Sequence, residues 1–295
     1  MQQCVICNSQ DYMIIGNPTL NHINKEIIRH NYKIAKCVQC DFYFVVPKLD
    51  LTINEWQSLY DAEYFFEMTP WHKRERSSNL KKRLHNLEKK CKNEIQRFLD
   101  VGCGEGYGII EASSKGWETY AFDIVDNRIE DAKDKTFDFK LGNIFTANYP
   151  ENYFDVAFMD SVLEHVVNPL DYLKELNRIL KPNGVLYIGV PNEDSLFNLV
   201  RQVIYFLIGK KHISIKTKPF KSPYHVVGFT KKSIRIIAKK SKFECIELTN
   251  FAARFEFNKY RINRKDFWIH FLLLPVDILA IPLRKEAYYE AIFKK

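Results

Sequence analysis

One stretch decides the fold of this 295-residue chain: Phe98-Leu-Asp-Val-Gly-Cys-Gly-Glu-Gly-Tyr-Gly108. Its opening, Phe98 to Val101, is apolar except for Asp100 and predicts a buried strand. The glycines that follow predict a turn into a helix that runs to about Lys115. Such a turn lets a ligand approach the backbone closely, and the helix start offers N–H donors. The stretch therefore predicts a ligand-binding turn at the end of a strand.

Strands and helices alternate on the C-terminal side of this turn. The apolar patterns predict a helix at 168–180 that ends at the turn Lys181-Pro-Asn-Gly184, and strands at 117–122, 137–141, 154–159, 185–190, 243–248 and 287–293. Strands that alternate with helices favour a parallel, doubly wound α/β sheet. On the N-terminal side, residues 52–91 are predicted to be helical.

The spacing of the glycines separates two classes of nucleotide ligand. The dinucleotide fingerprint G-x-G-x-x-G, started at Gly102, requires glycine at position 107, where this chain has Tyr107. Asp100 would repel a pyrophosphate but attract the ammonium and sulfonium groups of S-adenosylmethionine. Asp123 closes the second strand, where a carboxylate can bind both hydroxyls of a ribose. Alone, Asp123 could equally be a helix N-cap; with the glycine turn, it indicates an S-adenosylmethionine site.

Two segments resemble the class I S-adenosylmethionine-dependent methyltransferases. Phe98 to Gly106 resembles motif I of this family, and Asp155-Val-Ala-Phe-Met-Asp-Ser-Val-Leu-Glu-His-Val166, continued to Gly184, resembles its later motifs. The resemblance covers roughly residues 95–250 and implies a seven-stranded Rossmann-like sheet whose last strand, 287–293, is antiparallel. It implies Asn143 and Ile144 at the adenine, within a cofactor site formed by Asp100, Gly102, Gly104, Asp123, Ile124, Asn143, Ile144 and Asp160.

Four of the seven cysteines form two C-x-x-C pairs, Cys4/Cys7 and Cys37/Cys40, separated by 29 residues. Four thiolates at this spacing are typical of a tetrahedral structural zinc site. Four unrelated buried thiols are the alternative, and redox chemistry is disfavoured because neither pair opens a helix after a thioredoxin-like strand. We predict a zinc ribbon at 1–47. With Tyr60-Asp-Ala-Glu-Tyr-Phe65, it resembles a methyltransferase subgroup that acts on sugars, surface polysaccharides and secondary metabolites.

Methyl transfer to a hydroxyl or a carbon acid requires a base, and histidine is the natural one near neutral pH. His165 follows the fourth strand, and His225 lies in Pro223-Tyr-His-Val-Val-Gly-Phe-Thr230, which is similar to an element of the sugar and polyketide subgroup. Both are predicted catalytic candidates, with a structural histidine as the alternative for each. Glu164 with His165 could instead help to hold a divalent metal, as quinone-type relatives suggest.

The net charge of +8 is unevenly distributed. Residues 72–97 contain ten Lys or Arg and three acids, whereas residues 195–242 contain twelve Lys or Arg and no acid. Such asymmetry indicates a basic face toward an anionic partner, although the first run could equally be a solvated helix surface. We predict that 195–242 is a basic lid over the acceptor pocket. The apolar helix of this segment suits a membrane interface, or alternatively a buried lid or a dimer contact. The lysines that follow this helix suit the binding of a phosphorylated acceptor; they are Lys210, Lys211, Lys216, Lys218 and Lys221.

The composition is that of a globular protein, with 46% hydrophobic and 27% charged residues. The odd number of cysteines and the absence of a basic residue in Met1-Gln-Gln3 favour the cytoplasm. No spanning helix is expected, because the apolar segment 267–283 contains His270, Pro275, Asp277 and Pro282. The predicted organisation is a ribbon at 1–47, a helical connector at 48–92 and a methyltransferase domain at 93–295.

These features predict a cytoplasmic methyltransferase that acts on a sugar or glycan intermediate of bacterial surface-polysaccharide assembly. A phosphorylated sugar or a lipid-linked glycan is the expected acceptor, with peripheral contact to the inner face of the membrane left open. The alternative is a ribosomal or transfer RNA methyltransferase, because zinc ribbons occur there and basic segments bind phosphates. The chain lacks the Asn/Asp-Pro-Pro-Tyr/Phe motif for base nitrogens. A non-catalytic binding module is disfavoured because the cofactor motif is intact.

Overall fold

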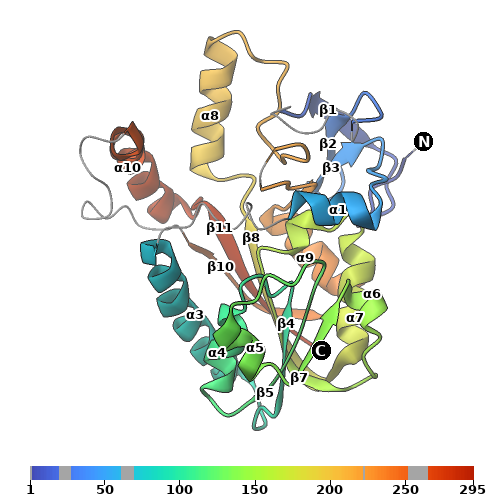
Figure 1. The fold of residues 1–295 in the computed structure, drawn as a ribbon. Helices are drawn as coiled ribbons and strands as arrows, with labels where there is room; N and C mark the ends of the chain where they lie inside the picture. Colours follow the sequence, from blue (N-terminus) through green and yellow to red (C-terminus); the bar gives the residue numbers. More distant parts are fainter. Residues whose placement is uncertain (1, 20–27, 61–69, 222, 252–264) are drawn as a thin grey trace.

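The computed structural model describes residues 2–19, 28–60, 70–221, 223–251 and 265–295. In these parts the chain forms two sheets (Figure 1). The larger has the strand order β10-β11-β8-β7-β4-β5-β6, and the smaller has the order β1-β2-β3-β9. No helix within the described ranges is long and apolar enough to cross a membrane.

The seven-stranded sheet is parallel except at one strand. It consists of β4 Arg97–Val101, β5 Glu118–Asp123, β6 Asp138–Leu141, β7 Phe154–Asp160, β8 Leu180–Pro191, β10 Glu244–Phe251 and β11 Tyr288–Lys294. β11 runs antiparallel to both of its neighbours, β8 and β10. The predicted doubly wound sheet with a reversed last strand is therefore confirmed. The carboxyl ends of β4, β5, β7 and β8 meet at one edge of this sheet.

Helices cover both faces of the large sheet (Figure 1). On one face lie α3 Pro70–Lys90, α4 Tyr107–Ser113 and α5 Glu130–Lys135; on the other lie α6 Ile144–Ala147, α7 Pro169–Ile179 and α9 Lys231–Lys240. Successive side chains of a strand point to opposite faces. In β4, Phe98 accordingly belongs to the same core layer as Leu84 of α3, whereas Leu99 belongs to the layer of Leu173 of α7.

The smaller sheet joins the N-terminal segment to the predicted lid. It is formed by β1 Tyr12–Gly16, β2 Lys33–Cys37, β3 Tyr43–Val46 and β9 Val227–Gly228. β9 belongs to the 195–242 segment and pairs antiparallel with β3. The ring of Phe42 packs against Phe229, with centroids 5.3 Å apart. The predicted domain boundaries stay predictions, but residues 1–47 and the lid share this sheet.

Other elements differ from the sequence prediction in detail. β8 begins at Leu180, before the predicted turn, because Leu180 already pairs with Phe154 of β7. The predicted turn is an irregularity inside the strand, since the next paired residue is Val185, and Asn183 takes a left-handed φ of 66° there. The predicted helical stretch 52–91 contains α1 Ile53–Leu59 and α3, and its residues 61–69 lie outside the described residues. α1 starts at a capping box in which Thr52 and Glu55 bond each other's backbone N–H. α8 Leu196–Leu207 and α10 Lys265–Leu283 contact each other at the carboxyl edge of the sheet.

Candidate active site

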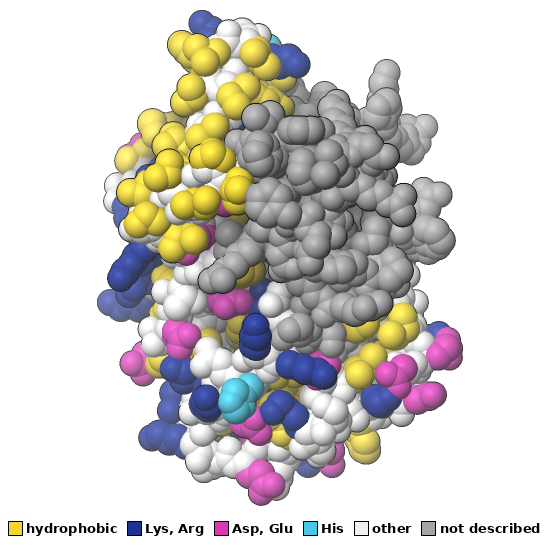
Figure 2. Space-filling model, turned by 90° about the vertical axis from the view of Figure 1, so that its left-hand side faces the viewer, with side chains coloured by type: hydrophobic (Ala, Val, Ile, Leu, Met, Phe, Trp, Pro, Cys, Tyr) yellow, Lys and Arg dark blue, Asp and Glu magenta, His cyan; other side chains and the backbone are white. Residues whose placement is uncertain are grey.

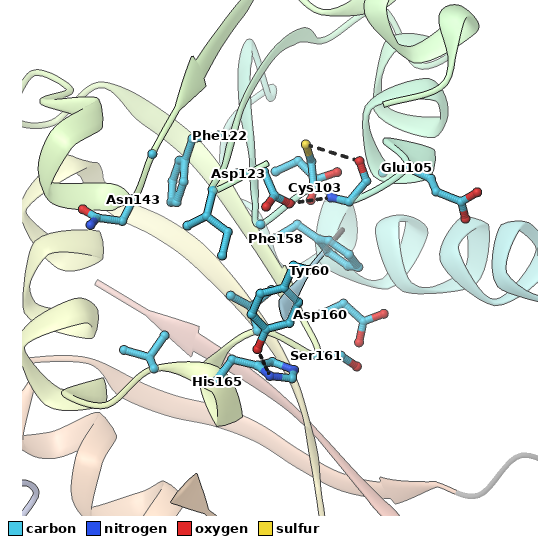
Figure 3. Close-up of a pocket in the computed structure, with 18 of the residues that line it drawn as sticks. Tyr60, Cys103, Glu105, Phe122, Asp123, Asn143, Phe158, Asp160, Ser161 and His165 are labelled. Atoms are coloured by element: carbon cyan, nitrogen blue, oxygen red, sulfur yellow. Dashed lines mark hydrogen bonds between the residues drawn. The ribbon is translucent and has the colours of Figure 1, made fainter. Parts of the chain in front are cut away.

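A cavity of about 380 Å³ opens at the carboxyl ends of β4, β5 and β7, and Figure 3 shows the residues around it. Tyr60 contributes to its wall from the segment that follows α1. Ile144 and His225 are not among the lining residues. The other predicted site residues converge on this one cavity: Asp100, Gly102, Gly104, Asp123, Ile124, Asn143, Asp160 and His165.

The glycine turn adopts a backbone that few other residues would tolerate. Gly102 has a φ of +66°, and a Cβ there would lie 2.7 Å from a methyl group of Val162. Gly108 lies in the first turn of α4 against Asp100, and a Cβ on it would collide with the Asp100 carboxylate. The backbone N–H of Gly104 donates to Asp123 Oδ2 at 2.8 Å (Figure 3). The glycines therefore hold two carboxylates beneath the start of a helix.

Three carboxylates, Asp100, Asp123 and Asp160, lie at the carboxyl ends of the neighbouring strands β4, β5 and β7. Burial, followed by the charges of Asp123 and Asp160, raises the pKa of Asp100 to about 8. Burial also raises the pKa of Asp123, and its backbone hydrogen bonds oppose this effect. A cation in the cavity would relieve the repulsion between these groups. This end of the cavity suits the ammonium and sulfonium groups of S-adenosylmethionine.

The adjoining wall of the cavity is largely apolar. Phe122, Ile124 and Phe145 line it together with Asn143. Asn143 caps α6, because its side-chain oxygen accepts the backbone N–H groups of residues 145 and 146 at 2.9 and 3.1 Å. Ile144 begins α6, and its side chain is fully buried in the core. Any contact of Ile144 with a ligand would therefore come from its backbone.

Arg83 of α3 also lines the cavity, although the sequence placed it in a basic helical run. Its side chain is only 14% exposed. The guanidinium donates to Asp160 Oδ2 at 2.8 Å and to Glu290 Oε1 at 2.5 Å. Charge-assisted bonds of this kind fix the orientation of a carboxylate. The interpretation of the 72–97 run as a solvated surface is therefore wrong for Arg83.

Of the two predicted histidines, His165 lines the opposite end of the cavity, and His225 lies against it without lining the cavity. The Tyr60 hydroxyl is hydrogen-bonded to His165 Nδ1 at 2.8 Å (Figure 3). His225 packs against His165, with ring centroids 5.1 Å apart and planes at 73°. Glu164 Oε1 lies 4.0 Å from His165 Nε2 and 3.8 Å from His225 Nε2. The structure thus brings together two histidines that are far apart in the sequence, with a carboxyl group between them.

Burial keeps this end of the cavity uncharged. It lowers the pKa of His165 to about 4, and with the charges of His165 and Lys218 it lowers the pKa of His225. It raises the pKa of Glu164, whose buried oxygens accept no hydrogen bond from the described residues. Ligands bonded to one tetrahedral ion at 2.0–2.2 Å would be about 3.4 Å apart. The divalent metal considered above would therefore require these side chains to move closer together.

Lys218 is a partly buried cation beside His225. Its backbone N–H donates to the His225 carbonyl at 2.7 Å. Burial, followed by the charge of Arg201, lowers the pKa of Lys218, and the nearby charge of Glu193 opposes this effect. No described carboxylate lies within 4 Å of its ammonium group. Lys216, by contrast, is already engaged by the acidic residues before α8. Of the predicted phosphate-binding lysines, Lys218 is the one that the structure places beside a catalytic candidate.

The four cysteines of the two C-x-x-C pairs come together next to the smaller sheet. Cys4 Sγ lies 3.5 Å from Cys40 Sγ, and Cys7 Sγ lies 3.4 Å from Cys37 Sγ. All four sulfur atoms lie within 4.8 Å of one another. These distances exclude disulfides, whose S–S bonds measure about 2.05 Å. They approach the separation of about 3.8 Å between sulfurs bound tetrahedrally to zinc at 2.3 Å, so the donor set fits this metal.

The reversed last strand, the glycine turn and the carboxylates at three strand ends define a Rossmann-like methyltransferase. A family model described as a methyltransferase domain matches residues 71–248, more than half of the chain. The chain therefore belongs to this methyltransferase family. The expected class of enzyme agrees with the class that the fold and the site define.

Individual relatives support the class without defining the acceptor. The chain is 37% identical over 132 residues to an uncharacterized protein of Methanocaldococcus jannaschii, covering 44% of this chain and 56% of that protein. It is 30% identical over 105 residues to a ubiquinone biosynthesis O-methyltransferase of Parvibaculum lavamentivorans, covering 34% and 42%. The matches thus span about half the length of these relatives. A SAM-dependent methyltransferase of Archaeoglobus fulgidus shares the fold, with a TM-score of 0.54, 20% identity and coverage of 80% and 100%.

Trp56, Tyr60 and Arg83 also line the cavity, and none of them was predicted to be a site residue. Tyr60 stood in a segment that resembles a subgroup, which was the one available signal. Arg83 carried no signal, because it is one of ten basic residues in its run. Their placement depends on where α1 and α3 pack against the large sheet.

Proposed function

We propose that the protein is an active S-adenosylmethionine-dependent O-methyltransferase that acts on a phosphorylated sugar or a lipid-linked glycan. The family and the fold support methyl transfer. The placement of Lys218 supports an acceptor that carries negative charge. Lys218 is a partly buried cation beside His225 and pairs with no described carboxylate. Arg201 and Lys221 add positive charge at the same place. A phosphate group would supply the missing negative charge.

The cofactor occupies the carboxylate end of the cavity in this proposal. S-adenosylmethionine, when bound, would supply an electrophilic methyl group, whose bond to the sulfonium sulfur breaks so that S-adenosylhomocysteine leaves with the electron pair. Asp123 holds the ribose hydroxyls, and Asp100 and Asp160 face the cationic end of the cofactor. Asn143 and the backbone of Ile144 border the adenine. The remaining contacts come from the turn and the adjoining wall, at Gly102, Gly104 and Ile124.

His165 is the base of the proposed reaction. The acceptor O–H bond breaks as the new O–CH3 bond forms, and the proton moves to His165, directly or through the Tyr60 hydroxyl. Burial lowers the pKa of His165 to about 4, so its imidazole is neutral at physiological pH with a free lone pair, although it is a weaker base than an exposed histidine. Glu164 lies 4.0 Å from His165 Nε2, and because burial keeps Glu164 protonated in the resting site, it would stabilise the imidazolium only after losing its proton. His225 supports the His165 ring through their edge-to-face contact.

The proposal includes a structural zinc ion bound by Cys4, Cys7, Cys37 and Cys40. This ion would fix the N-terminal segment that carries β3. β3 pairs with β9, which begins two residues after His225. The ribbon would thereby stabilise the end of the cavity at which His165 and His225 lie, without contacting the cavity itself.

The test is a methylation assay with labelled S-adenosylmethionine and three acceptor sets: sugar nucleotides with lipid-linked sugar pyrophosphates, hydroxylated quinone precursors, and ribosomal RNA. We expect labelling of the first set. Lys218→Glu should lower kcat/KM for that acceptor at least tenfold and leave the Kd for S-adenosylmethionine unchanged. Lys82→Glu, an exposed lysine of α3, is the matched control and should have no effect.

Labelling of RNA alone would contradict the sugar proposal. In that case the affinity would also fall steeply with salt, by roughly 0.7 log units per log unit of salt for each phosphate bound on a single strand. A pyrophosphate acceptor has two phosphates and should show a shallow dependence. Wild-type kinetics in Lys218→Glu would remove Lys218 from the acceptor site.

The relatives favour a second acceptor class, the phenolic hydroxyl of a quinone precursor. The Parvibaculum lavamentivorans relative is named for ubiquinone biosynthesis. The apolar and aromatic side chains of Trp56, Phe145 and Phe158 line the cavity and would pack against an aromatic ring. Because such a ring carries no phosphate, its methylation should not respond to Lys218→Glu, and the same assay separates the two classes.

A further inference from the structure

α8 is an amphipathic helix in which no side chain is buried, although nine of its twelve residues are hydrophobic. Leu199, Val203, Phe206 and Leu207 follow one another at helical spacing and share one side of the helix. Phe206 is 64% exposed and Leu207 is 75% exposed. A helix that served only to cover the core would turn these side chains inward.

The exposed side of α8 continues onto α10, which it contacts. The C-terminal part of α10 exposes Ile278, Leu279, Ile281 and Leu283, each by more than half. Figure 2 shows hydrophobic side chains gathered over the upper left of this side of the molecule, where these helices lie. The exposed residues of α8 and of 278–283 are termed the apolar face below. Contiguous apolar surfaces of this kind mark sites of protein or membrane contact.

Basic residues border the apolar face at both ends. Lys210 and Lys211 follow the tip of α8, and Arg284 and Lys285 follow α10 at the opposite end, where the chain returns to the start of α8. All four side chains are exposed. Residues 195–242 contain no acid. Within residues 273–285 the acid is Asp277, which is half-buried and has an interaction partner of its own.

We propose that the apolar face is a docking surface for an anionic lipid bilayer, on which the protein lies peripherally. A helix in the membrane interface places aliphatic and aromatic side chains among the acyl chains and lysines or arginines at the headgroups. The apolar face with its two basic ends has this arrangement. The inference concerns the surface alone and holds for any methyl acceptor.

The docking surface lies close to the proposed reaction. α8 follows β8 at the carboxyl edge of the large sheet, and the cavity opens at the same edge. A protein bound through α8 and α10 therefore keeps this edge near the lipid headgroups. A lipid-linked acceptor would then approach the cavity without leaving the bilayer.

The test measures co-sedimentation of the full chain with vesicles. One set contains equal parts phosphatidylglycerol and phosphatidylcholine, and the other contains phosphatidylcholine alone. We expect binding to the anionic vesicles that is at least tenfold stronger than to the neutral ones. The double variant Phe206→Glu/Leu207→Glu should weaken this binding at least tenfold. Lys210→Gln/Lys211→Gln should weaken it by roughly fivefold for each lysine, on anionic vesicles only.

Phe137→Glu is the matched control. Phe137 is 68% exposed beside β6, at the opposite edge of the large sheet from β10, and its variant should bind like the wild type. Circular dichroism and the melting temperature verify that each variant is folded, and Leu207→Ser provides a milder change. The proposal is overturned if the wild type fails to bind anionic vesicles at low ionic strength, or if the α8 variants bind as well as it does. A dimer that Phe206→Glu dissociates would assign the apolar face to a second copy of the chain.

Discussion

The two ends of the cavity contain buried titratable groups of opposite behaviour. At the carboxylate end, burial, followed by the charges of Asp123 and Asp160, raises the pKa of Asp100 to about 8. At the histidine end, burial lowers the pKa of His165 to about 4 and raises that of Glu164, so the groups there stay neutral. The first arrangement is suited to binding a positive charge. The second keeps both imidazoles in their neutral form.

The two ends also differ in how the chain builds them. The carboxylate end comes from three neighbouring parallel strands and one glycine turn. The histidine end is assembled from Tyr60 after α1, His165 after β7, and His225 next to β9, which pairs with the N-terminal segment. Changes at one end should therefore separate experimentally from changes at the other.

Replacement of His165 should produce the largest effect. If His165 is the base, His165→Ala should lower turnover by about 10²–10⁴-fold and leave S-adenosylmethionine affinity within about twofold. Initial rates and titration calorimetry measure the two quantities. His225→Ala is the comparison variant, and its loss of turnover should be the smaller one. The reverse order would assign the base to His225, and a loss below about tenfold in both would return both residues to a structural role.

Asp123→Ala tests the other end of the cavity. Loss of hydrogen bonds to a charged group should weaken S-adenosylmethionine binding by about 1.5–3 kcal/mol, with the fold intact. Asp126→Ala is the matched control, because Asp126 is exposed and pairs with Arg128 on the surface. Calorimetry should show the loss for Asp123 only. Equal affinity in the two variants would contradict the ribose assignment.

The carboxylate end could be predicted from the sequence because its residues lie within or next to continuous motifs. A strand, a turn and an acid at the next strand end place Asp100, Gly104 and Asp123 together in any parallel sheet of this kind. The seven-stranded sheet and the reversed β11 likewise followed from the resemblance and are confirmed. The proposed roles of these residues stay predictions until they are tested.

At the histidine end, the sequence predicted individual candidate residues but not the site that they form together. The sequence indicated His165 and His225 but contained no information that their rings meet, since this depends on the pairing of β9 with β3. Tyr60 reaches His165 because α1 packs over the cavity. Arg83 was indistinguishable from its basic neighbours until α3 was placed beside Asp160. Tertiary packing, rather than local pattern, decides these positions.

The pH dependence of cofactor binding gives a third distinction between the ends. Because Asp100 must be ionised to attract a cation and has a pKa of about 8 without ligand, S-adenosylmethionine affinity should rise by up to about tenfold per pH unit between pH 6 and 7.5. Asp100→Asn should remove this rise. Calorimetry across this range is the measurement. A flat wild-type profile would contradict the pKa of Asp100.

The same group affects stability with a definite sign. The folded-state pKa of Asp100, about 8, lies above the ordinary value of 3.8, so its contribution to stability is fully present below pH 3.8 and is lost progressively as the pH rises to about 8. Without cofactor, Asp100→Asn should therefore raise the melting temperature at pH 8.5 by at least about 2 °C, and should change it less at pH 5. A lower melting temperature of the variant at pH 8.5 would contradict this sign.

Loss of the zinc ribbon should affect acceptor turnover at the histidine end but not cofactor binding at the carboxylate end. Its effect on activity should be the smallest of those predicted here. Purified protein should contain about one zinc ion per chain, and Cys37→Ser should release it and make residues 1–47 sensitive to protease. β3 pairs with β9, which begins two residues after His225. We therefore expect a loss of acceptor turnover of about tenfold or less and an unchanged Kd for S-adenosylmethionine. Cys91→Ser, outside the cluster at the end of α3, is the matched control. Elemental analysis that finds no metal in protein prepared without chelators would contradict the zinc ribbon. A loss of S-adenosylmethionine affinity as large as the loss of acceptor turnover would contradict a link of the ribbon to the histidine end alone.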